Sequence, residues 1–319
     1  MDPALIVPAD SVQACKDAVA YIRERLPPRF MPKIGVICGS NTPLTASDLG
    51  KDCVEICLED IPGFVKSTVV TTQAKRKLLA GSLGDTPVVV VLGRIQYYEG
   101  YSLKQITLPI RVLKKLGVDT LIVTGAVSSI DHDIKIGDIA VIADHVSLPA
   151  VTGLNPLIGP HLSQMGPRYP SMANTYTYKL RKLTFKTWLQ SPSLKARGIR
   201  LAEAIYGYST GPSFETRAEI RALKLLGCNI VGNCITPEIM MARYCGMDVL
   251  ALCMVTTMAP YHREPSALDA AVAELEGRKL PITKEEEEED ILAYKDNIRQ
   301  SMKRSMDVKL LINEILEHL

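Results

Sequence analysis

The sequence predicts an α/β fold built on a mainly parallel β-sheet, and three features of residues 86–148 indicate it. Val88–Leu92 is an unbroken apolar run, which is typical of a strand buried on both faces of a sheet. Residues 102–116 place apolar side chains at helical spacing, and Gly117 follows them as a favourable C-cap. Asp119–Val123 is a second strand-like run. Strand, helix and strand in this order form one right-handed crossover unit.

Two polar features follow the strands of this unit. Arg94 comes just after the first strand, and Gly125-Ala126 comes just after the second. Ligands of such sheets collect at the carboxyl ends of the strands. An arginine beside a turn of small residues offers charged and backbone N–H donors to an anion. The sequence therefore predicts an anion site at this edge of the sheet.

The remaining elements follow from periodicity and from turn residues. Further strands are expected at residues 34–38, 54–58, 67–72, 78–83, 139–142, 199–208, 230–234 and 249–255. Further helices are expected at residues 11–26, 176–191, 219–226, 237–244 and 290–319. Residues 149–171 form a long Pro- and Gly-rich loop, and residues 262–284 have no clear pattern. Asp144-His145 is placed at a strand end, where a lone histidine more often has a structural role.

Composition excludes several classes of protein. The chain has 319 residues, of which 47% are apolar and 23% charged, with a formal net charge of +2. This balance predicts neither a nucleic-acid nor a membrane partner. The N-terminus does not resemble a signal peptide, and no apolar run reaches the ~20 residues of a membrane span, so a cytoplasmic location is expected. The eight scattered cysteines, including Cys53 and Cys57, lack a matching histidine pair and are expected to be reduced thiols without zinc.

A series of segments in a fixed order resembles the trimeric purine nucleoside phosphorylases. They are ICGS (37–40), IPGFVKSTV (61–69), LGRIQYYEGYSL (92–103), LPIRVLKKLGVDTLIVT (108–124), GDIAVIADHVSLP (137–149), GLNPLIGP (153–160), GPSFETRAE (211–219) and TPEIMMARYCGM (236–247). The resemblance implies a single α/β domain over residues 1–319, with a mixed, partly barrelled sheet flanked by helices. Residues 260–289 are then a divergent insertion before a C-terminal helix.

The resemblance also implies a reaction and an assembly. In this family phosphate attacks C1′ of a purine nucleoside, the base leaves and ribose 1-phosphate forms. Such a reaction needs an anion site for phosphate and stabilisation of charge on the departing base. It needs no metal and no organic cofactor. Family members are homotrimers, so the expected partners are a nucleoside or base, phosphate and two further copies of the chain.

The phosphate site implied by the resemblance is partly altered. Ser40 and Arg94 stand where the family has its serine and arginine, and Ala126 matches a residue that contributes its backbone N–H. Cys234 replaces a family serine and is a weaker donor. Gln96 replaces a histidine two residues after the arginine. A second histidine has no counterpart, and Thr72 or Gln73 occupies its region.

The nucleoside site implied by the resemblance is altered as well. Phe214 and Glu215 match the aromatic wall and the carboxylate that accepts a purine N–H. Thr257 takes the place of the asparagine that supports N7 of the leaving base, so Glu215 and Thr257 are the expected catalytic pair. The residues expected around the sugar are Tyr98, Asn233 in place of a methionine, and Met165 in place of an aromatic residue that a neighbouring subunit lends.

These replacements leave three functions open. The first is a phosphorylase with altered substrate preference, because Ser40, Arg94, Tyr98, Phe214 and Glu215 are all retained. The second is a catalytically weak or inactive relative that binds a nucleoside or has a structural role. The third is hydrolysis, with water replacing phosphate in a weakened anion site. Phosphate dependence of product formation separates the first function from the third. Calorimetry with nucleosides and phosphate separates the two forms of the second function, a nucleoside-binding protein and a purely structural one.

Overall fold

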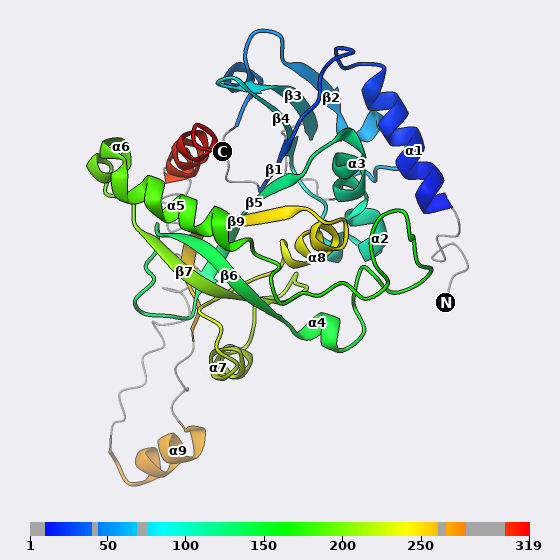
Figure 1. The fold of residues 1–319 in the computed structure, drawn as a ribbon. Coiled ribbons are helices and arrows are strands. Elements are labelled where there is room, and N and C mark those ends of the chain that lie inside the picture. The colour runs from blue at the N-terminus through cyan, green and yellow to red at the C-terminus, as the bar shows by residue number, and fades with distance from the viewer. Residues whose placement is uncertain (1–9, 40–43, 69–75, 261–265, 279–303) are drawn as a thin grey trace.

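The structure, a computed structural model, describes residues 10–39, 44–68, 76–260, 266–278 and 304–319 (Figure 1). Within these residues the strands form one nine-stranded mixed sheet in the order β2-β3-β4-β1-β5-β8-β7-β6-β9. The strands are β1 (Ile34–Cys38), β2 (Val54–Cys57), β3 (Lys77–Leu83), β4 (Thr86–Leu92), β5 (Thr120–Ser129), β6 (Ile139–Ser147), β7 (Leu201–Tyr208), β8 (Ile230–Gly232) and β9 (Asp248–Met258).

Helices lie around this sheet, except α9 (Ala267–Leu275), which lies apart from it (Figure 1). They are α1 (Asp10–Arg23), α2 (Leu103–Ile106), α3 (Leu108–Leu116), α4 (Leu148–Val151), α5 (Tyr178–Gln190), α6 (Pro192–Ala196), α7 (Arg217–Leu225), α8 (Thr236–Tyr244) and α9 (Ala267–Leu275). Residues 304–316 form a further helix near the C-terminus.

One part of the sheet closes on itself. Besides its place in the strand order, β5 pairs in parallel with β9 from Thr120 opposite Asp248 to Ser129 opposite Met258. The strands β5, β8, β7, β6 and β9 therefore form a ring, and β1 to β4 extend from it as an open sheet. Parallel and antiparallel pairs both occur. The prediction of an α/β fold with a mixed, partly barrelled sheet is confirmed.

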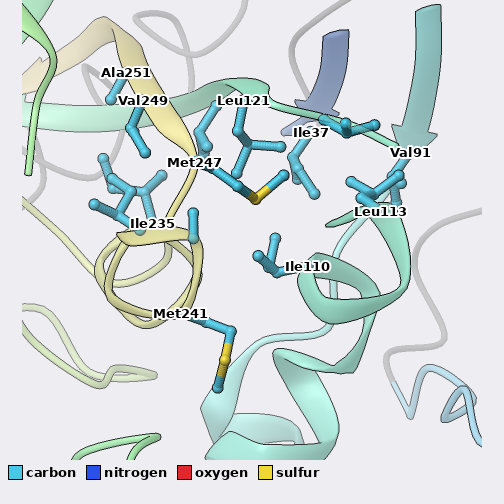
Figure 2. Close-up of a cluster of buried hydrophobic side chains, with 14 of the residues drawn as sticks. Ile37, Val91, Ile110, Leu113, Leu121, Ile235, Met241, Met247, Val249 and Ala251 are labelled. Carbon is cyan, nitrogen blue, oxygen red and sulfur yellow. The ribbon is translucent and has the colours of Figure 1, made fainter. Parts of the chain in front are cut away.

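The central strand β4 is buried on both faces, as its valine run predicts. Val89 and Val91 belong to one hydrophobic cluster, while Val88 and Val90 belong to another. The first cluster lies between the sheet and the helices α3 and α8, where Ile110 meets Met247 and the strand residues around them (Figure 2). Burial of this face holds α3 and α8 on the sheet, and α8 adjoins the site described below.

The predicted helix at residues 102–116 is wrong in one respect, because it is two helices. α2 ends at Ile106 and α3 begins at Leu108, with Thr107 between them. Pro109 explains the break, since proline has no N–H and its ring clashes with the carbonyl group four residues earlier. The hydroxyl of Thr107 donates to the carbonyl of Leu103 at 2.7 Å and so closes the end of α2.

Two strands run further than their apolar patterns predict. Gly125 and Ala126 lie inside β5, not in a turn after it, because β9 pairs with β5 along its whole length. Asp144 and His145 lie inside β6, which pairs with β7 as far as Ser147. The His145 ring nitrogen Nδ1 lies 2.9 Å from the Tyr176 hydroxyl, a contact that suits a structural role.

The C-terminal part of the chain also differs from expectation. Residues 267–275, which show no clear pattern in sequence, form α9, whose first turn is capped by the Ser266 hydroxyl accepting from Asp269 N at 3.2 Å. Most of the strand predicted at 67–72 lies outside the described residues, and Ser67 and Thr68 belong to no strand. The terminal helix is described only over 304–316. The boundaries of a single domain with an insertion at 260–289 stay a prediction.

Two further observations concern membrane-crossing helices and disulfides. Across the described part of the chain, no helix has the length and apolar character to cross a membrane. All eight cysteines are described, and none forms a disulfide.

A large-to-small substitution tests the packing of α3. Leu113 is 1% exposed, so Leu113→Ala should lower the free energy of unfolding by about 2–5 kcal/mol, measured by urea denaturation. Leu225→Ala is the control, because that side chain is 89% exposed on α7 and should change stability by less than about 0.5 kcal/mol. Equal effects would contradict this account of the core.

Candidate active site

A cavity of about 420 Å³ opens beside the ends of β1, β4, β7 and β8, with β5 and β9 along one wall. Residues from distant parts of the chain meet there because the ring closes β5 against both β8 and β9. The expected site residues that line it are Arg94, Gln96, Tyr98, Ala126, Phe214, Glu215, Asn233, Cys234 and Thr257.

Three expected residues are not among those lining the cavity. Ser40 and Gln73 lie outside the described residues. Met165 lines a separate cleft with Val19 of α1 and Lys115 of α3. Within one chain Met165 is therefore not part of the cavity, and its expected supply by a neighbouring subunit stays a prediction. The segment that carries it runs along the surface near α1 instead.

The end of β4 brings Arg94 to the cavity. Gly93 follows the last strand residue with φ +81°, a conformation that L-residues with a side chain rarely adopt. A Cβ atom at Gly93 would lie 2.8 Å from Cγ of Arg76, so the arginine stem packs directly over the glycine. The chain can therefore turn sharply after Leu92 and direct Arg94 across the end of β1 toward β5.

Arg94 is held by a buried ion pair with Glu238. Its Nη2 donates to Oε2 of Glu238 at 2.9 Å, and its Nε lies 3.2 Å from both carboxylate oxygens. The two side chains are 6% and 8% exposed. A third bond runs from Nη1 to the carbonyl of Thr124 at 2.9 Å. Arg94 therefore joins the end of β4 to β5 and to the first turn of α8.

The ion pair keeps the arginine charged and leaves donors for a ligand. Burial alone lowers the pKa of Arg94, but the charge of Glu238 and its hydrogen bonds outweigh burial and hold that pKa above its ordinary value. Guanidinium has five N–H donors. Three of these N–H groups are engaged by Glu238 and Thr124. One N–H therefore remains on each terminal nitrogen of Arg94, which lines the cavity.

The edge of β5 supplies backbone groups beside Arg94. β1 pairs with β5 only as far as Ile37 opposite Val123, so β5 continues past the end of β1 along the cavity. Gly39 donates its N–H to the Thr124 hydroxyl at 3.1 Å, which fixes the turn that leaves β1. Ala126 lies on the stretch of β5 that extends beyond its pairing with β1, and it lines the cavity.

Cys234 occupies the wall next to Arg94. Burial raises the pKa of its thiol, although the positive charge of Arg94 opposes the shift. The thiol is therefore neutral near pH 7 and is a weak donor. The backbone N–H of Cys234 donates to the Tyr206 hydroxyl at 3.3 Å, and this bond anchors the turn after β8.

The other end of the cavity carries acceptor and hydroxyl groups. The Ser209 hydroxyl donates to Oε1 of Glu215. The hydroxyl oxygens of Ser128 and Thr257 lie 2.6 Å apart. Phe214 is 65% exposed and Tyr98 39% exposed, so both rings border the opening and not the buried end. In the described residues no group of three or more His, Cys, Asp or Glu side chains is arranged to hold a metal ion.

Sequence reasoning missed Glu238, Ser128 and Ser209. Glu238 follows Pro237 at the start of α8, where a carboxylate is also favoured by the helix dipole. Its pairing with Arg94, 144 positions away, becomes visible only in the fold. Ser128 and Ser209 stand at strand ends, where small hydroxyl residues are common and carry little signal.

Removing one member of the buried ion pair tests its importance. Glu238→Ala leaves Arg94 charged without a partner and should lower the free energy of unfolding by about 3–5 kcal/mol in urea denaturation. Glu203→Ala breaks the ion pair between Arg181 and the Glu203 carboxylate, a side chain that is 50% exposed, and should cost at most about 1 kcal/mol. A Glu238 effect no larger than that of Glu203 would contradict the assignment.

A methyl group at Gly211 tests the shape of the cavity. Gly211 has φ +61°, and a Cβ there would lie 2.7 Å from Nδ2 of Asn233 and 3.0 Å from Cδ1 of Tyr98. Gly211→Ala should therefore displace both side chains and weaken ligand binding at least tenfold in calorimetry. Gly227→Ala is the control, because its Cβ would meet nothing within 4 Å despite φ +89°. Unchanged affinity in Gly211→Ala would show that these side chains do not contact the ligand.

Comparison with known proteins identifies the family of this chain. The Phosphorylase superfamily profile matches residues 33–280. The purine nucleoside phosphorylase of Saccharomyces cerevisiae is 39% identical over 278 residues, which span 84% of this chain and 88% of that protein. Purine nucleoside phosphorylase 1 of Geobacillus stearothermophilus is 38% identical over 246 residues, 77% of this chain and 85% of that protein.

A solved structure extends the comparison to the whole fold. The crystal structure of Schistosoma mansoni purine nucleoside phosphorylase in complex with inosine superposes with a TM-score of 0.80 at 30% identity and covers 97% of both chains. The chain is therefore similar to purine nucleoside phosphorylases in both sequence and fold over most of its length. The chain belongs to the phosphorylase superfamily and, within it, to the purine nucleoside phosphorylase family.

Proposed function

We propose that this protein catalyses reversible phosphorolysis of purine nucleosides, in which phosphate attacks C1′ and the products are the free base and ribose 1-phosphate. The observation that carries the proposal is the cavity that contains both Arg94, with two N–H donors to spare, and Glu215. A cation for phosphate and a carboxylate for a purine N–H are what the reaction requires. The relatives named purine nucleoside phosphorylase support the same reaction.

The roles proposed for the phosphate side follow from charge and donors. Arg94 and the backbone N–H of Ala126 hold phosphate, with Gln96 as a further amide donor in the same wall. Cys234 contributes a thiol that is neutral and weak. Ser40 and Gln73 complete the set on sequence grounds alone. Glu238 keeps Arg94 oriented, so that phosphate binds a guanidinium already aligned for it.

The roles proposed for the nucleoside side follow from shape and polarity. Tyr98 and Asn233 contact the ribose, Phe214 covers the base, and Glu215 accepts a base N–H. Thr257 donates to the base as negative charge develops on it, which lowers the barrier to its departure. Because Asn233 and Thr257 replace a methionine and an asparagine of the family pattern, we expect a substrate preference that differs from that of typical members.

Assembly and location are part of the proposal. A homotrimer in which a neighbouring subunit supplies Met165 would explain why this residue lies outside the cavity of its own chain. The exposed Phe214 and Tyr98 rings at the opening would then gain an apolar neighbour. We further propose that the protein acts in the cytoplasm, in keeping with its reduced cysteines.

An assay of inosine and guanosine with and without phosphate tests the reaction. The double variant Arg94→Gln/Glu238→Gln exchanges the buried ion pair for neutral amides and so leaves no unpaired charge. It should lower kcat/KM for phosphate about 10²–10⁴-fold, because two hydrogen bonds to a charged ligand are each worth roughly 1.5–3 kcal/mol. Arg181→Gln/Glu203→Gln makes the same exchange in the surface pair and should change kcat/KM less than about threefold.

The same assay separates the alternatives. Release of ribose without phosphate would indicate hydrolysis in place of phosphorolysis. Heat of nucleoside binding without any product would indicate a binding protein. Equal activity in both double variants would contradict the role of Arg94.

A further inference from the structure

Ser128 lines the cavity and has no role in the mechanism proposed above. It lies on β5, and its hydroxyl oxygen is 2.6 Å from that of Thr257 on β9. Thr257 is 8% exposed, so water competes little for this contact. The two hydroxyl groups therefore form a hydrogen-bonded pair on the cavity wall, which we call the hydroxyl pair.

An irregularity in the sheet creates this pair. Up to Val127, which lies opposite Val255, β5 and β9 pair residue by residue. At the next step the register shifts, and Ser128 lies opposite Thr257, with Thr256 as the extra residue of a bulge. The Thr256 hydroxyl donates to the carbonyl of Val127 at 3.2 Å and so stabilises the bulge. Bulges next to binding sites commonly redirect a side chain, and this one brings Thr257 to Ser128.

Counting protons shows what the hydroxyl pair offers to a ligand. Each hydroxyl has one proton, and either oxygen can be the donor across the 2.6 Å contact. One proton therefore lies between the oxygens, and the other remains for a group in the cavity. If Ser128 donates to Thr257, the Thr257 proton is the one directed to the ligand, and its bond is strengthened because hydrogen bonds in a chain polarise one another.

We propose that Ser128 is a positioning residue for the leaving base: it donates to Thr257 so that the Thr257 hydroxyl donates to N7 of the purine. The inference rests on the proposed function, because N7 becomes more basic only as the bond to C1′ breaks and electrons move into the base. A threonine alone could turn its proton to any nearby acceptor. Paired with Ser128, it provides the directed donor that an amide would otherwise supply.

Two substrates distinguish this role from a structural one. Inosine needs a donor at N7 when its base departs. 7-Methylinosine carries a methyl group and a positive charge there, so its base departs neutral and gains nothing from that donor. Phosphorolysis of both is measured for the wild type, Ser128→Ala, Thr257→Val, the double variant and Thr257→Ser, each checked for folding by thermal unfolding.

For inosine we expect kcat/KM to fall about tenfold in Ser128→Ala and about 10–100-fold in Thr257→Val, the range for hydrogen bonds to a group that develops charge. The double variant should fall no further than Thr257→Val, because the two residues act as one unit. Thr257→Ser, which keeps the hydroxyl, should stay within about threefold. For 7-methylinosine every variant should stay within about threefold.

The outcomes separate this inference from the function on which it depends. If the wild type turns over inosine but Ser128→Ala loses kcat/KM equally for inosine and 7-methylinosine, the role of Ser128 is overturned. Phosphorolysis as the function would then remain intact. Additive losses in the double variant would also overturn it. No turnover of either nucleoside by the wild type would overturn the proposed function itself, and the inference with it.

Discussion

The ion pair between Arg94 and Glu238 is the interaction on which the site depends. It joins the end of β4 to the first turn of α8, and the bond from Arg94 to Thr124 adds β5 to the same junction. Both side chains are almost fully buried, so each charge depends on the other for its stabilisation there. The pair therefore keeps a cation on the cavity wall before any anion arrives, and a ligand needs only to occupy the donors that remain.

Closure of the sheet determines which residues can meet Arg94. β5 contacts β1, β8 and β9, so one strand brings the arginine end of the site together with Asn233, Cys234 and Thr257. In an open sheet these segments would lie at separate edges. The bulge between β5 and β9 then sets the base end, because it replaces a Ser128–Thr256 pairing by Ser128–Thr257. Closure of the sheet and the bulge between β5 and β9 together determine which polar groups line the cavity wall.

Sequence alone predicts much of this architecture, because most elements have strong periodicity or strong end signals. The valine run of β4 and Gly117 after α3 are examples. Sequence-based prediction fails where tertiary pairing extends a strand beyond its apolar run, as at Gly125 and at His145. Nine of the expected site residues line one cavity, but the partner of Arg94 was not foreseen, since no local pattern relates residues 144 positions apart. The role expected for Met165 depends on a neighbouring subunit, so it stays a prediction.

A crystal structure with phosphate bound is the most direct test of whether Arg94 holds an anion in the cavity. We expect a phosphate oxygen within hydrogen-bond distance of a terminal nitrogen of Arg94, with Glu238 still paired to the same guanidinium and the backbone N–H of Ala126 directed to the anion. Phosphate bound elsewhere while Arg94 contacts only Glu238 and Thr124 would contradict it. In that case the arginine would be part of the scaffold, and the cavity would have no anion site around it.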